Sequence, residues 1–163
     1  LTRTSGTLKQ KIHGLHNVIK MRTGLRLTHV INALTYKRLR DLVIFLNKEV
    51  PELKNMQFSF VKIIGNAVKN PSILTTYAKV APFLRDAIKA CEERKITVTI
   101  DHIPPCYLGM YKKYHADSKK FAIGEKPIFS LMEKSKIRAC NNCKLAINCC
   151  GPRTDYLEYY KVS

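Results

Sequence analysis

Apolar residues recur every three or four positions in three stretches of the chain, which predicts three amphipathic helices. The first should begin at Thr7, which forms a capping-box pattern with the Gln three residues later, and should stop at Gly24. The second should stop at Pro51, and the third should begin close to Pro82, because proline is tolerated only in the first turn of a helix. The three apolar stripes are Leu8, Ile12, Leu15 and Ile19; Leu39, Leu42, Val43, Leu46 and Val50; and Tyr77, Ala81, Leu84, Ile88 and Cys91.

Three short segments, one after each of these helices, are β-branched or alternate between apolar and polar residues, which predicts strands at 27–31, 56–61 and 96–100. Strands that alternate with helices at this spacing indicate βαβ units, so we expect an α/β fold with a parallel sheet and helices on its outer face. In such folds functional groups gather at the carboxyl ends of the strands. Asp101 follows the third strand there, although a lone carboxylate is weak evidence of a site.

The chain has 163 residues, 45% of them hydrophobic, which is enough for a packed core and excludes a largely disordered protein. Its 29 Lys and Arg exceed its 12 Asp and Glu and give a net charge of +17. Such a charge can attract nucleic acid or another acidic partner, but the lysines are dispersed singly, which favours an ordinary solvated surface. No apolar run is long enough to span a bilayer and no secretory segment opens the chain, so we expect a cytoplasmic protein without membrane contact.

Residues 101–163 are rich in Tyr, Lys and Cys and have weak periodicity, which indicates an appended element around a site. Cys140, Cys143 and Cys149 follow one another as C-x2-C-x5-C, and Cys106 follows two prolines that stiffen the chain beyond the third strand. Four thiolates select Zn²⁺ or an iron–sulfur cluster. A single C-x2-C pair suits a cluster better than a zinc ribbon, but both remain open, and Cys150 is a spare or surrogate ligand. A disulfide framework is disfavoured without a secretory signal.

These motifs resemble the C-terminal half of a radical S-adenosylmethionine (radical SAM) superfamily enzyme, MoaA/PqqE-like, with a SPASM-type auxiliary iron–sulfur region. The resemblance runs through nearly the whole chain, and its cysteine pattern is its most specific part. The stretches that carry it are 1–8, 13–17, 29–32, 77–84, Ile103-Pro-Pro-Cys106 and Cys140-x2-Cys143-x5-Cys149-x-Gly151 followed by Tyr156.

The resemblance implies that residues 1–101 form the C-terminal part of a partial (β/α)6 TIM-like barrel and that 102–163 form a Cys-rich auxiliary iron–sulfur region. It also implies that S-adenosylmethionine contacts Asn32, Arg3 and Val61. No catalytic residue is assigned. The implied ligands of an auxiliary [4Fe–4S] cluster are Cys106, Cys140, Cys143 and Cys149.

The chain departs from the family by lacking the C-x3-C-x2-C motif that binds the radical-initiating cluster, and it also lacks the Gly-Gly-Glu strand. Because it starts at Leu1 and not Met, we expect a fragment whose N-terminal half belongs to the same or a separate chain. Alone it should be inactive as an oxidoreductase or maturase. A peptide, a small molecule or tRNA would suit as substrate. The alternative is a basic four-cysteine zinc module that binds RNA or another acidic partner.

Overall fold

The computed structural model describes residues 6–22, 24–126 and 128–162 and contains a parallel sheet of three strands in the order β1-β2-β3. Ile31 of β1 lies opposite Phe60 of β2, and Phe58 of β2 lies opposite Ile100 of β3. The predicted α/β class and parallel sheet are therefore confirmed. The strands are β1 (Leu27–Ile31), β2 (Asn55–Phe60) and β3 (Thr97–Asp101).

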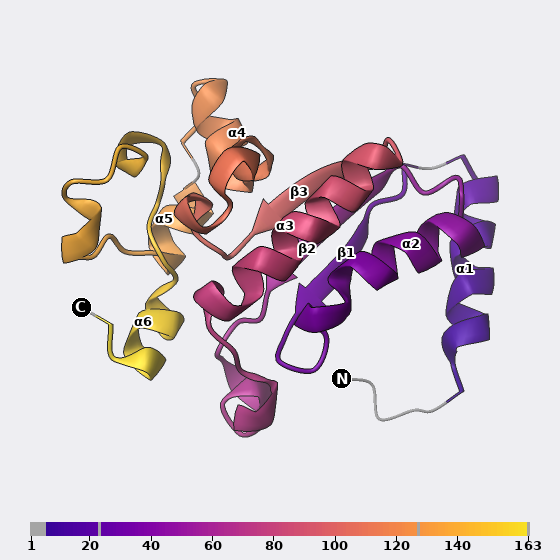
Figure 1. Ribbon diagram of the computed structural model, residues 1–163, viewed down its shortest axis with the longest axis horizontal. Coiled ribbons are helices and arrows are strands. Elements are labelled where there is room, and N and C mark those ends of the chain that lie inside the picture. Colours follow the sequence, from indigo (N-terminus) through magenta and orange to yellow (C-terminus); the bar gives the residue numbers. More distant parts are fainter. Residues whose placement is uncertain (1–5, 23, 127, 163) are drawn as a thin grey trace.

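Six α-helices accompany the sheet in the described part of the chain, and the first three alternate with the strands along it. Figure 1 shows α2 and α3 side by side across the sheet, with α4, α5 and α6 gathered beyond the arrowhead of β3. The C-terminal residues thus lie at the carboxyl end of the sheet. The helices are α1 (Leu8–Lys20), α2 (Leu39–Glu49), α3 (Tyr77–Glu93), α4 (Ala116–Ala122), α5 (Ile128–Glu133) and α6 (Thr154–Tyr160).

The two faces of the sheet differ in composition. Phe58, Leu84 and Ile88 are fully buried in one core cluster, which also takes in most of the apolar stripes of α2 and α3. Side chains alternate across a strand, so the residues between the core positions face the other way. Among these, Thr28 is exposed and Val30 is 49% exposed. The helices therefore cover one face and leave part of the other open.

Three details of the predicted helices are wrong. The Thr7 side chain makes no cap hydrogen bond to α1, and the left-handed residue after this helix is Arg22 (φ 54°) and not Gly24. Helix α3 begins at Tyr77, so Pro82 lies inside it, close to the N-terminus. The Thr76 side chain accepts a hydrogen bond from the Lys79 N–H, so this side chain is the cap that starts the helix.

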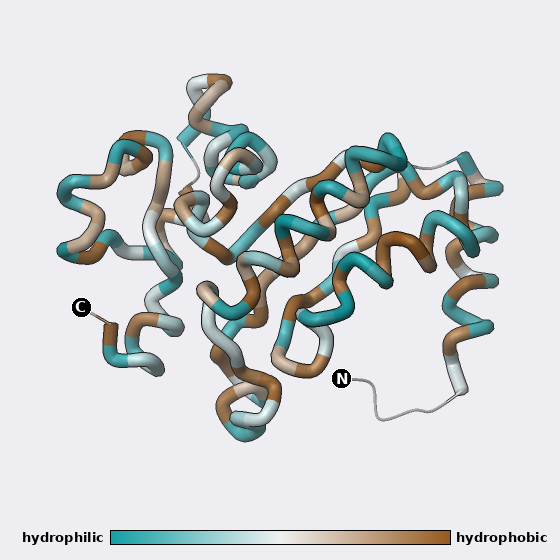
Figure 2. Tube along the Cα trace, viewed as in Figure 1, coloured by the Kyte–Doolittle hydropathy of each residue, from teal (hydrophilic) through white to brown (hydrophobic). Residues whose placement is uncertain are grey.

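The segment after β3 consists of short turns and helices instead of regular layers. Figure 2 shows hydrophilic and hydrophobic residues mixed along it in short stretches, whereas α1 and α3 alternate in regular turns. Two stretches of this segment pair over a short distance. Lys134 and Arg153 form an isolated antiparallel bridge, and the Ser135 N–H donates to the Pro152 carbonyl at 2.9 Å. Across the described residues, every helix is too short or too polar to cross a membrane.

Candidate metal centre

Four cysteines from three separate turns line one cavity beside the end of β3. Cys106 lies in a 3-10 turn that begins at Pro105, and Cys140 ends another such turn. The Cys143 N–H donates to the Cys140 carbonyl at 3.1 Å, so the C-x2-C pair closes a turn of its own. Cys149 follows a third 3-10 turn. The cavity has a volume of about 260 Å³.

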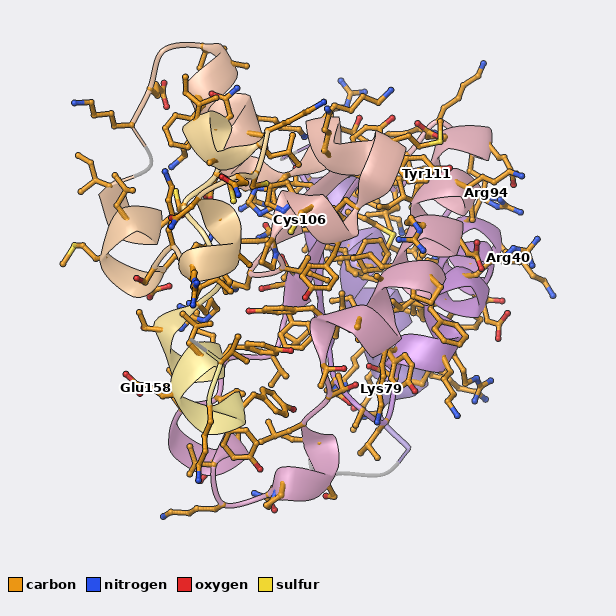
Figure 3. All side chains as sticks on the ribbon, turned by 60° about the vertical axis from the view of Figure 1, so that its left-hand side comes forward. Arg40, Lys79, Arg94, Cys106, Tyr111 and Glu158 are labelled. Carbon is orange, nitrogen blue, oxygen red and sulfur yellow. The ribbon has the colours of Figure 1, made fainter. Side chains whose placement is uncertain are left out.

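The Cys106 turn is anchored to the core of the molecule. Pro104 and Pro105 are buried, and Arg85 of α3 donates from Nη1 to the Tyr107 carbonyl at 3.0 Å. In Figure 3, Cys106 lies on the side of the molecule where the C-terminal turns pass, away from Arg40 and Arg94. A rigid strand end thus presents one thiol to a segment that carries the other three.

Gly151 fixes the geometry next to Cys149. Its φ is +91°, and a Cβ there would lie 2.2 Å from the Ser135 carbonyl oxygen, so only glycine fits. This close approach lets the Gly151 N–H donate to Cys149 Sγ at 3.3 Å. Amide donors to sulfur stabilise a thiolate and tune the potential of iron–sulfur centres. The backbone at this point suits a ligand sulfur.

The thiols are close enough to affect one another's protonation. Burial raises the pKa of Cys106, and the neighbouring Cys149 and Cys143 raise it further. Burial also raises the pKa of Cys149, although the Gly151 hydrogen bond opposes this shift. Several thiols that hold each other protonated are ready to lose their protons together when a cation binds between them.

In the described part of the chain, no three Cys, His, Asp or Glu side chains lie close enough together to hold a single metal ion. Zinc needs its thiolates at roughly 2.3 Å, which places the sulfurs within about 4 Å of one another. An iron–sulfur cluster instead spreads its thiolates over several irons.

Comparison with known proteins gives no relative for this chain. No family model, curated protein or solved structure matches it.

The remaining cysteines lie outside this cavity. Cys91 is fully buried on the apolar stripe of α3, as its position in the sequence predicts. Cys150 is 3% exposed and does not line the cavity, whereas the adjacent Cys149 does. Burial raises the pKa of Cys150 to about 12, and Asp117 adds to this shift. Its thiol is therefore held protonated next to the carboxylate of Asp117.

The residues expected to contact S-adenosylmethionine lie at strand ends. Asn32 follows β1 and Val61 follows β2, and the Val61 N–H donates to the Ile31 carbonyl at 3.0 Å, so the two are neighbours. The Asn32 side chain is engaged locally: Oδ1 accepts from the Leu34 N–H at 3.0 Å, and Nδ2 donates to the Val30 carbonyl at 3.2 Å. Arg3 lies outside the described residues.

Buried charges that the sequence did not reveal hold the segment around the cavity. Lys134 donates to Asp117 at 2.6 Å, and both side chains are 3% exposed. Ser130 donates to the same carboxylate at 2.7 Å, and His115 is 1% exposed beside it. Because these residues are widely spaced in the sequence and follow no helical or strand period, no pattern marks them as partners.

A second polar group ties α6 to the loop after β2. Arg153 is 4% exposed and donates to Asp155, whose carboxylate accepts the Ile63 N–H at 2.7 Å. The Tyr156 ring stacks on Tyr77 of α3 with ring centroids 3.8 Å apart. Tyr156 thus packs the C-terminal segment against the domain.

Proposed function

We propose that Cys106, Cys140, Cys143 and Cys149 bind a [4Fe–4S] cluster, and that the chain is the C-terminal portion of a radical SAM enzyme in which this cluster is auxiliary. The observation that carries the proposal is the meeting of these four cysteines around one cavity, although Cys106 is far from the other three in sequence. The hydrogen bond from the Gly151 N–H to Cys149 Sγ supports the same assignment.

A bound cluster would supply electron transfer or an open iron position for a substrate; with four protein thiolates, electron transfer is favoured. The residues of this chain would position it. Pro105 and the Arg85 anchor fix the Cys106 turn, and the Gly151 amide would stabilise the thiolate of Cys149. Lys136 lines the cavity and would offset negative charge.

The three strands and their helices suit the later part of a partial (β/α)6 barrel, because the sheet is parallel and the face opposite α2 and α3 is open at Thr28 and Val30. The N-terminal half, in the same or a separate chain, would supply radical initiation. Asn32 and Val61, and in prediction Arg3, would then contribute to the S-adenosylmethionine site at the ends of β1 and β2.

The test is anaerobic reconstitution with ferrous iron and sulfide, followed by metal and sulfide analysis. The intact chain should bind about four irons with a matching amount of labile sulfide and show broad visible absorbance. Cys143→Ala should lose most of the iron, the sulfide and the absorbance. Cys91→Ala, the same change at a cysteine outside the cavity, should retain them. Cys150→Ala should also retain them, since Cys149 lines the cavity. One Zn²⁺ per chain without labile sulfide would contradict the proposal and favour the zinc module.

A further inference from the structure

A serine, a histidine and an aspartate meet at the carboxyl end of the sheet, apart from the cysteine cavity. The strand register places Val30, Ser59 and Asp101 in one row across β1, β2 and β3, on the face opposite Phe58 and the helices. Ser59 itself is 9% exposed, but Val30 beside it is 49% exposed, so the open part of this face borders Ser59.

His102 follows Asp101 and holds an unusual backbone conformation. Its φ is +62°, a left-handed value that costs a non-glycine residue about 1–3 kcal/mol unless its surroundings enforce it. The Asp101 carboxylate enforces it by accepting the His102 N–H at 2.8 Å. This conformation turns the imidazole back over the sheet toward β2.

The side chains are arranged as nucleophile, base and orienting acid. Ser59 Oγ lies 2.9 Å from His102 Nδ1, and His102 Nε2 lies 3.3 Å from Asp101 Oδ2. Glu133 stands behind the same nitrogen at 3.9 Å. A hydroxyl within hydrogen-bond reach of an imidazole that a carboxylate orients is the signature of an activated nucleophile.

Burial and the nearby cations favour the neutral form of the His102 imidazole by lowering its pKa. Burial lowers its pKa; Asp101 raises it in part, and the cations Arg153, Lys62 and Lys134 lower it again. A neutral ring whose Nε2–H faces two carboxylates leaves Nδ1 free to accept the Ser59 proton. The imidazolium formed by that transfer would lie beside Asp101 and Glu133.

We propose that Ser59 is a nucleophile, with His102 as its base and Asp101 as a positioning residue, for an acyl or phosphoryl ester that lies on the open face of the sheet beside Val30. Ser59 Oγ forms a bond to the electrophilic carbon or phosphorus, and its proton moves to His102 Nδ1. The bond to the leaving group breaks, and the leaving group departs with its electron pair and takes the proton from His102. This activity is independent of the cluster proposed above.

A fluorophosphonate probe tests this on the intact chain without added metal. Ser59 Oγ should form a bond to phosphorus with loss of fluoride, and mass spectrometry of the peptides should place the adduct on Ser59. Ser72, which is exposed and lies outside the sheet, is the matched internal control and should remain unlabelled. Absence of an adduct on Ser59 in folded protein, or equal labelling of Ser72, would overturn the proposal.

Variants show whether His102 activates Ser59 or whether Ser59 is simply accessible to the probe. His102→Gln should slow labelling of Ser59 by about 10²-fold or more, because a general base contributes that much. Ser72→Ala should label as the wild type does. If Ser59 is labelled equally fast in His102→Gln, the role of His102 is overturned. Far-ultraviolet circular dichroism would check that this variant is folded.

The pH dependence tests Asp101. The charged groups around His102 are Asp101 from β3, Glu133 from α5, Lys62 from the loop after β2, and Lys134 and Arg153. Since Asp101 favours the protonated imidazole, Asp101→Asn should move the midpoint of labelling to lower pH as well as slow it. A midpoint that does not move would reject Asp101 as the orienting residue.

Discussion

The sheet with its helices and the segment after β3 are held together by different forces. Around the sheet the buried residues are mostly apolar and form one contiguous core. After Asp101, the described residues contribute four buried hydrophobic side chains, and an equal number of buried polar or charged ones: His115, Asp117, Lys134 and Arg153. The cysteine cavity therefore lies in a segment whose shape depends on a few buried ion pairs, and on whatever binds the thiols.

The largest effect should come from breaking the Lys134–Asp117 pair. Lys134→Ala leaves the Asp117 carboxylate buried without its cation, which should lower stability by about 3–5 kcal/mol. Urea denaturation would measure the loss, and hydrogen exchange should show it concentrated after β3 and weak in α3. Lys144→Ala, at an exposed lysine in the same segment, should change stability by less than about 0.5 kcal/mol.

An apolar replacement of both partners sharpens this test. Lys134→Met combined with Asp117→Leu removes both buried charges and should recover much of the lost stability. A double variant as unstable as Lys134→Ala would show that packing around these side chains, and not their charge, holds the segment.

Truncation of the core should act on the other region. Leu84 is fully buried in α3, so Leu84→Ala should cost about 2–5 kcal/mol. Here the faster hydrogen exchange should extend through all three strands as well as the C-terminal segment. Exchange confined to the C-terminal segment would contradict the division between an apolar core and a dependent polar segment.

A smaller effect is expected from Gly151→Ala. The new Cβ would meet the Ser135 carbonyl oxygen at 2.2 Å and would require a left-handed alanine, at a cost of about 1–3 kcal/mol. The local shift should also weaken the Gly151 N–H to Cys149 hydrogen bond and lower iron uptake. Gly124→Ala is the control, because it also replaces a glycine at positive φ but meets no atom within 4 Å; it should leave iron uptake unchanged.

The smallest effect is a pH dependence from Glu133. Hydrogen bonds from Lys62 and Arg153 lower its pKa to about 2, against burial, from an ordinary value near 4.3. The contribution of Glu133 to the free energy of unfolding should be complete above about pH 4.3 and lost as the pH falls toward 2. This contribution should stay under about 1 kcal/mol because the carboxylate is partly solvated. Acid denaturation of Glu133→Gln should lack this component, and an unchanged acid profile would contradict it.

The two regions also differ in how far their sequences predict them. Apolar residues spaced three or four apart indicate the helices, and alternating apolar and polar residues indicate the strands around Phe58 and Leu84. Burial of one face of each element imposes these periods on the chain. The pair Lys134 and Asp117 leaves no such period, since each is placed by turns. Cysteine spacing predicted the grouping of Cys140 with Cys143, and the strand end suggested Cys106 as their partner. By contrast, the pairing of Ser59 with His102 depends on strand register and a left-handed residue, which periodicity does not encode.

We propose that the four cysteines bind a cluster, and that this cluster stabilises a segment with few buried apolar side chains. Hydrogen exchange of the chain before and after anaerobic reconstitution with iron and sulfide tests it most directly. We expect the amides of residues 138–151 to become protected on reconstitution, while those of α3 exchange at an unchanged rate. Equal exchange throughout both samples, or protection that persists in Cys143→Ala, would contradict it.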